Sequence, residues 1–169
     1  MRACPPCTCP TAVPSFTGGA HPSLIYDYHG FPPETYALEY AAPGHPALAR
    51  QAAQLLQQAG FAATVDADYG WDHGVFIPLK VMLPDANVPV VAMSLQAKLD
   101  PTLHCELGAA LQSLRDEGVL YGNREERTRS LAVWNRAPGG PASHPREEHF
   151  LPLMVASGVG SDLPAWAFD

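Results

Sequence analysis

Two amphipathic segments dominate the patterning of this 169-residue sequence, and each begins at a proline and ends before a glycine. The first starts at Pro46 and ends before Gly60, and its apolar residues recur at helical spacing: Leu48, Ala52, Leu55, Leu56 and Ala59. The second starts at Pro101 with Asp100 as N-cap and ends at Gly118, with an apolar face of Leu103, Leu107, Ala110, Leu111 and Leu114. Proline at the first helical position and glycine after the last residue are typical helix boundaries. Both segments are predicted to be helices.

Short apolar stretches follow or precede these helices. Phe61–Val65 and Val119–Tyr121 are predicted strands, and Val88–Leu95 is predicted to be a strand buried on both faces. Asp72–Leu83 has helical apolar spacing, although Pro78 weakens that prediction. Alternation of strands and helices at this spacing predicts an α/β fold with a mostly parallel sheet flanked by helices.

Composition supports one globular domain. Apolar residues make up 47% and charged residues 16% of the chain, which is enough to bury a core, while 18 prolines indicate many turns. We predict a disordered Pro/Cys-rich tail over residues 1–15 and a single domain over residues 16–169.

The net charge of −7 argues against nucleic acid as a partner, because phosphate backbones repel an anionic surface. No apolar run reaches membrane-spanning length, and the N-terminus has no apolar stretch typical of a secretory signal. The expected compartment is therefore the cytoplasm. The sequence leaves the oligomeric state open.

Cysteines offer one weak candidate site. Cys4, Cys7 and Cys9 form a C-x-x-C-x-C cluster in the predicted tail, which either begins a zinc or redox site or is a disordered segment. Cys105 is predicted to be a small buried apolar residue.

Seven histidines are the candidates for acid–base or metal chemistry at neutral pH. His21, His29 and His45 are expected to be exposed or to cap helices, and His104 to lie on a helix surface. His73 stands beside Asp72 and Gly74 at the start of an apolar segment, so it is either an approachable functional residue or a structural histidine.

His149 shares a predicted helix face with Leu153 and Ala156, so its ring should point inward. Spacing alone is compatible with a metal ligand and with a core histidine bonded to a carbonyl. Motifs for dinucleotides, P-loops, H-E-x-x-H zinc sites and the G-x-S-x-G nucleophile elbow are absent from the sequence.

Several blocks, in order, cover the chain from about Leu24 to Gly158. They are Tyr26–Tyr36, Trp71–Gly74, Met82–Ala86, Val88–Val91, Ser94–Gln96, Leu114–Leu120 and His144–Leu153. Together they resemble the class III extradiol ring-cleavage dioxygenases of the DOPA-4,5-dioxygenase type.

The resemblance implies an α/β fold, a single Fe(II) or Zn(II) ion, and ring opening of a small aromatic diol such as DOPA by O₂. It implies that His149 is a metal ligand, and that His73 positions substrate and oxygen or assists proton transfer. An oxidoreductase of this family is thus the first functional hypothesis.

The sequence lacks the family's H-G-S-P and S-A-H-W histidine segments, its G-S-G loop and its final strand, so the fold is expected to be incomplete relative to the family. The second hypothesis is accordingly a shortened, catalytically impaired relative that binds a partner or an aromatic ligand. It predicts weak Fe(II) binding and no turnover of catechol. A zinc hydrolase on a related fold is a third class, for which no activated-water constellation is visible.

Overall fold

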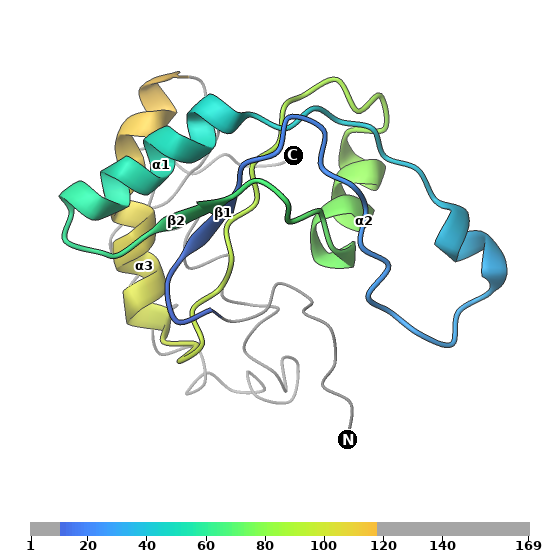
Figure 1. Ribbon diagram of the computed structural model, residues 1–169, viewed down its shortest axis with the longest axis horizontal. Coiled ribbons are helices and arrows are strands. Elements are labelled where there is room, and N and C mark those ends of the chain that lie inside the picture. The colour runs from blue at the N-terminus through green and yellow to red at the C-terminus, as the bar shows by residue number, and fades with distance from the viewer. Residues whose placement is uncertain (1–10, 118–169) are drawn as a thin grey trace, which may run out of the picture. The chain divides into compact units, whose positions relative to one another are not determined.

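The computed structural model describes residues 11–117 of the chain (Figure 1). Its elements, in order, are β1 Ser15–Thr17, the 3₁₀ helix η1 Pro33–Ala37, α1 Pro46–Gln58, β2 Thr64–Asp66, α2 His73–Met82, α3 Pro101–Ala110 and the 3₁₀ helix η2 Gln112–Glu117. The contacts divide the described residues into two compact units, 11–54 with 63–94 and 55–62 with 95–117. The predicted elements from Val119 onward lie outside the described residues.

The first unit contains a parallel pair of strands (Figure 1). Ser15 pairs with Thr64 and Thr17 with Asp66, and α1 lies between the two strands in sequence, as in a crossover connection. Helices combined with a parallel sheet confirm the predicted α/β class. On the other edge of β1, the Thr17 amide donates to the Ala92 carbonyl at 2.9 Å.

The prediction of a strand buried on both faces at Val88–Leu95 is wrong. The segment forms only isolated bridges, Val90 with Gly44 and Met93 with Phe16. Val88 is 44% exposed. Pro89 has no amide to donate to a ladder, and the Ala92 amide donates to the Thr17 hydroxyl rather than to a carbonyl.

The strand predicted at Phe61–Val65 begins later than expected, as β2 Thr64–Asp66. The Phe61 amide donates to the Leu56 carbonyl at 2.9 Å, so Phe61 completes the end of α1 instead. Gly60 there has φ +89°, the left-handed conformation that glycine adopts without a Cβ clash. The predicted end of this helix is confirmed.

The core of the first unit forms around Trp71 and Phe76, whose side chains are fully buried with Tyr40 and Ala42. Phe76 comes from α2, which continues through Pro78 to Met82. Helix α2 begins at an N-cap, Asp72, whose carboxylate accepts the Val75 amide at 3.2 Å. The core therefore fixes the start of α2, where His73 is the first residue.

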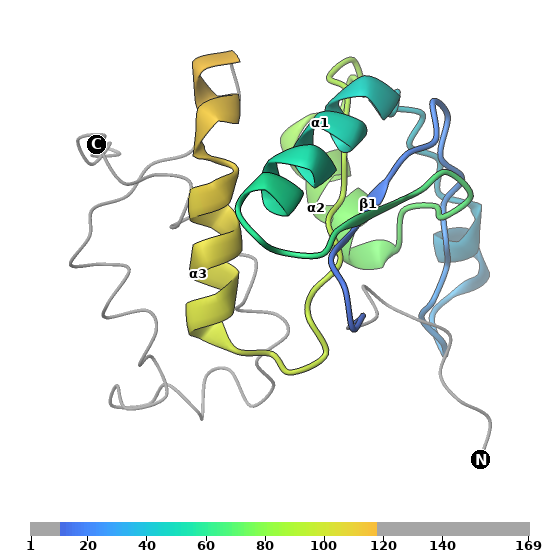
Figure 2. The ribbon, with the colours of Figure 1, turned by 60° about the vertical axis from the view of Figure 1, so that its left-hand side comes forward.

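The second unit contains α3, which runs on into η2 (Figure 2). The Asp100 carboxylate accepts the Thr102 amide at 2.9 Å, as the predicted N-cap requires. Leu107, Leu111 and Leu114 are buried, and so is Cys105, which confirms its prediction as a small buried residue.

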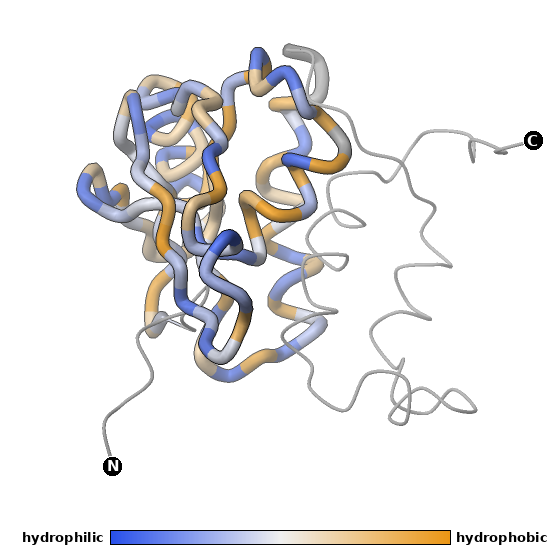
Figure 3. The backbone as a smooth tube through the Cα atoms, turned by 90° about the vertical axis from the view of Figure 1, so that its right-hand side faces the viewer, coloured by the Kyte–Doolittle hydropathy of each residue, from blue (hydrophilic) through white to orange (hydrophobic). Residues whose placement is uncertain are grey.

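Hydrophobic and hydrophilic stretches are interspersed along the described part of the backbone (Figure 3). Within residues 11–117 no helix combines the length and hydropathy needed to cross a bilayer.

Thr11 lies in the predicted tail, and its hydroxyl is 2.7 Å from that of Ser94. Ser15, also in the predicted tail, already belongs to β1. The assignment of residues 16–169 to one domain stays a prediction.

Candidate functional site

The candidate site is built on a backbone pairing between two segments distant in sequence. The Trp71 amide donates to the Ser23 carbonyl at 2.8 Å, and the Ile25 amide donates to the Trp71 carbonyl at 2.7 Å. This short parallel bridge places the residues after Ile25 beside the start of α2. Residues 24–28 are partly or fully buried, whereas residues 29–33 are exposed.

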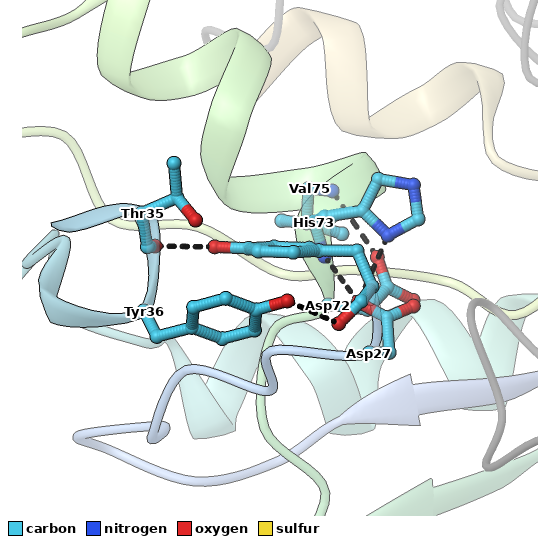
Figure 4. Close-up of polar contacts among 7 residues, drawn as sticks. Asp27, Thr35, Tyr36, Asp72, His73 and Val75 are labelled. Carbon is cyan, nitrogen blue, oxygen red and sulfur yellow. Dashed lines mark hydrogen bonds and ion pairs between the residues drawn. The ribbon is translucent and has the colours of Figure 1, made fainter. Parts of the chain in front are cut away.

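The bridge brings Asp27 against His73, 46 residues away in the chain (Figure 4). Asp27 Oδ1 lies 2.8 Å from His73 Nδ1 and also accepts the His73 backbone amide at 3.1 Å. The Asp27 side chain is fully buried, whereas that of His73 is 38% exposed. His73 is thus held from its buried side and approachable from the other.

Asp27 is held in its ionised form by this contact. Burial raises the pKa of the Asp27 carboxyl, but hydrogen bonds from the ring and backbone of His73 outweigh it, so the pKa lies below the ordinary value of 3.8. Oδ2 of the same carboxylate is buried and has no hydrogen-bond partner among the described residues. Asp27 had no predicted role from the sequence.

An aromatic cluster packs around the pair. The Tyr28 ring meets the His73 ring edge-on, with ring centroids 6.0 Å apart. The Tyr28 hydroxyl donates to the Thr35 carbonyl at 2.5 Å, and the Tyr36 hydroxyl donates to the Tyr28 carbonyl at 3.3 Å (Figure 4). Burial, and then the neighbouring Tyr26 and Tyr36, raise the pKa of the Tyr28 hydroxyl, so it stays a donor at neutral pH. Tyr28 is therefore fixed in place beside His73.

A cavity of about 150 Å³ lies in the first unit, beside β1. Its wall includes Phe16, Tyr69, Asp72, Val75 and Met93, and its lining is largely apolar. An apolar cavity of about this volume accepts one benzene ring. Asp72 and Val75 in the wall also form the N-cap of α2, so the cavity and His73 share the start of that helix.

The remaining described histidines have structural or exposed positions. His21 and His29 are exposed, and His45 Nδ1 accepts the Leu48 amide at 3.0 Å, which confirms the predicted exposed and capping positions. The prediction that His104 lies on a helix surface is wrong.

His104 is fully buried, with Nδ1 2.6 Å from the Asp100 carbonyl and Nε2 accepting the Gln96 amide at 3.1 Å. Burial lowers the pKa of His104 below the ordinary 6.5, although its bond to the Asp100 carbonyl raises it. Both ring nitrogens are thus occupied within the fold, and His104 is a structural histidine.

Residues 11–117 contain no group of three or more His, Cys, Asp or Glu side chains placed to hold a metal ion. His149, the metal ligand that the resemblance implies, and the cluster Cys4, Cys7 and Cys9 lie outside the described residues. The described part of the chain therefore does not by itself fit a metal of the Fe(II) or Zn(II) type, which needs three or four donors.

Residues 10–122 match the family described as the catalytic LigB subunit of aromatic ring-opening dioxygenase. The chain is 36% identical to a dioxygenase of Hapsidospora irregularis, with 90% of this chain and 61% of that protein covered. It is 34% identical to the 4,5-DOPA dioxygenase extradiol of Portulaca grandiflora, with 90% of this chain and 69% of that protein covered.

A solved structure, that of an uncharacterized protein from Escherichia coli K12, is similar in fold. It has a TM-score of 0.63 and 26% sequence identity, and the match covers 87% of this chain and 70% of that one. The chain thus spans about three fifths to two thirds of the length of the curated relatives it matches.

Proposed function

The chain belongs to the LigB family of aromatic ring-opening dioxygenases, and from this premise we propose that it takes part in extradiol cleavage of a small aromatic diol, such as DOPA, by O₂. The observation that carries the proposal is the His73–Asp27 pair, in which a half-exposed imidazole is held by a buried carboxylate. His73 is the proposed catalytic residue.

Ring opening of a diol requires that a proton leave a hydroxyl group and later return to the product. Imidazole suits this task because it gains and loses a proton near neutral pH. Asp27 contacts His73 Nδ1, so the atom available to a substrate is Nε2 (Figure 4). The neighbouring Tyr28 ring, perpendicular to the imidazole, limits how far the imidazole can turn.

A metal belongs to this proposal through the family. We propose Fe(II) or Zn(II) as the ion and His149 as one of its ligands. Residues 11–117 hold no group of three donors, so they do not supply the whole set of ligands by themselves.

A second candidate function takes account of the missing group of three metal donors in residues 11–117. A relative with too few metal ligands would keep the scaffold and bind an aromatic ligand or a partner without turnover. The apolar cavity beside β1, with a volume suited to one aromatic ring, supports aromatic binding in this case. Weak Fe(II) binding and no turnover of catechol, as predicted from the sequence, belong to this candidate.

The test is anaerobic reconstitution of the full 169-residue chain with Fe(II), followed by O₂ and DOPA or catechol. A yellow ring-opened product, lost in His149→Ala, supports the dioxygenase. Binding of the diol without any product favours the second candidate. Because the three cysteines are candidate metal ligands independent of the site, the matched control is the triple substitution Cys4→Ser, Cys7→Ser and Cys9→Ser, which should leave the product unchanged.

A further inference from the structure

We propose that Asp27 is a positioning residue that holds His73 in the tautomer with the proton on Nδ1, so that Nε2 is the proton-accepting atom. The inference rests on the proposed function for the use made of that atom. The tautomer itself is a property of the folded chain, with or without turnover.

One oxygen of Asp27 contacts His73 at two points. Oδ1 accepts the backbone amide at 3.1 Å and lies 2.8 Å from ring Nδ1. The first contact fixes the main chain of His73, and the second fixes the rotation of its ring. Nε2 lies on the side of the ring away from Asp27 (Figure 4).

The chemistry of the two groups decides where the proton lies. An ionised carboxylate only accepts hydrogen bonds, and a neutral imidazole carries one N–H and one acceptor nitrogen. With Asp27 ionised, the ring nitrogen that faces it must be the donor. The neutral His73 ring then has Nδ1–H and a free electron pair on Nε2, the arrangement a general base requires.

A purely structural role for Asp27 is the competing explanation, because its oxygen also accepts the first amide of α2. Helix α2 already has Asp72 as its N-cap, however, and the Val75 amide is satisfied there. Burying a carboxylate with Oδ2 unpartnered among the described residues reduces stability. Accepting the first amide of α2 does not by itself account for a buried carboxylate at position 27. Orientation of the His73 ring does account for it.

Nitrogen-15 NMR of the imidazole rings in the full-length chain tests the proposal, at about pH 8.5 where histidine is mostly neutral. Two other histidines calibrate the spectrum. The His104 ring, with Nδ1 at the Asp100 carbonyl and Nε2 accepting an amide, should be the Nδ1–H tautomer. The His45 ring, with Nδ1 accepting an amide, should be the Nε2–H tautomer. His73→Gln assigns the His73 signals.

The wild-type His73 ring is expected to match His104 rather than His45. Asp27→Ala removes the oxygen that accepts Nδ1–H, so it should give mixed tautomers at His73 and leave the signals of His104 and His45 unchanged. In the isosteric control Asp27→Asn, one amide oxygen in the place of Oδ1 can still accept both the backbone amide and Nδ1–H, so the Nδ1–H signature should persist.

A wild-type His73 ring in the Nε2–H form, or an unchanged ring in Asp27→Ala, would overturn the proposal. If Asp27→Ala does not fold, the wild-type spectrum still decides the first point, and Asp27→Leu, which also lacks the acceptor but fills more of its volume, decides the second. The proposed function can fail independently of this proposal. In that case the His73 tautomers are as expected, but the chain gives no ring-opened product.

Discussion

Gly70 is predicted to be the glycine on which the candidate site depends most directly. It precedes Trp71, whose amide and carbonyl form the bridge to Ser23 and Ile25. A Cβ at Gly70 would lie 2.1 Å from the Ser23 carbonyl oxygen and 3.1 Å from its carbon. Both are backbone atoms, so no side chain can turn aside to make room. In Gly70→Ala the two segments must therefore separate.

The expected loss of stability follows from that separation. The two bridging hydrogen bonds contribute about 1 kcal/mol each, and forcing extra volume into a packed site costs about 1–3 kcal/mol. Replacing glycine with alanine returns about 0.5–1 kcal/mol by restricting the unfolded chain. The free energy of unfolding should therefore fall by about 2–4 kcal/mol. The contact between Asp27 and His73, which lies just beyond the bridge, should weaken with it.

Gly30→Ala is the matched control in the same unit. Gly30 has φ +81°, and a Cβ at this position would meet no atom within 4 Å. Alanine there therefore encounters backbone strain but no clash, at a cost of about 1 kcal/mol. Urea unfolding followed by tryptophan fluorescence measures both variants. If Gly70→Ala costs no more than Gly30→Ala, the bridge does not hold the site together and the reasoning fails.

Three further predictions concern other positions. His73→Gln should lower the rate of any ring opening by about 10²- to 10⁴-fold while the far-UV circular dichroism stays unchanged; an unaltered rate would remove His73 from the reaction. Burial lowers the pKa of His104 below 6.5, so the His104 imidazole is protonated more readily in the unfolded chain than in the folded one. The contribution of neutral His104 to the free energy of unfolding is therefore present above about pH 6.5 and is lost as the pH falls toward the folded-state pKa. His104→Gln should flatten this part of the urea-midpoint profile against pH, and identical profiles would contradict the assignment. Phe76→Ala should cost about 3–5 kcal/mol because its side chain is 0% exposed, whereas Val81→Ala on the same helix, 79% exposed, should change stability by less than about 0.5 kcal/mol; equal urea midpoints would argue against this core.

The helices were predictable because their boundaries are local. Asp100 and Pro101 at the start of α3, and Gly60 after α1, act through neighbouring residues, and the structure has these caps as expected. The segment Val88–Leu95 was not predictable in the same way. Whether an apolar run forms a ladder depends on partners elsewhere in the chain, and here Val90 and Met93 find only isolated bridges.

The error at His104 had a signal that could have prevented it. His104, Leu107, Leu111 and Leu114 recur at spacings of three and four residues, so they lie on one helix face. All four are buried. A buried histidine is compatible with a core when both ring nitrogens have partners, as the Asp100 carbonyl and the Gln96 amide provide here.

His73 was predictable as a candidate because it stands beside an acid and a glycine, but that neighbouring acid, Asp72, is not its partner. Asp72 caps α2, and the carboxylate that contacts the imidazole comes from Asp27, 46 residues earlier. Nothing local links the two residues. Their contact follows from the bridge between Leu24 and Trp71, because Asp27 and His73 each lie within three residues of it. A shift of this pairing by one residue would turn alternate side chains to the opposite face and separate the carboxylate from the ring. The register of the bridge, more than the residues beside His73, therefore determines whether the site exists.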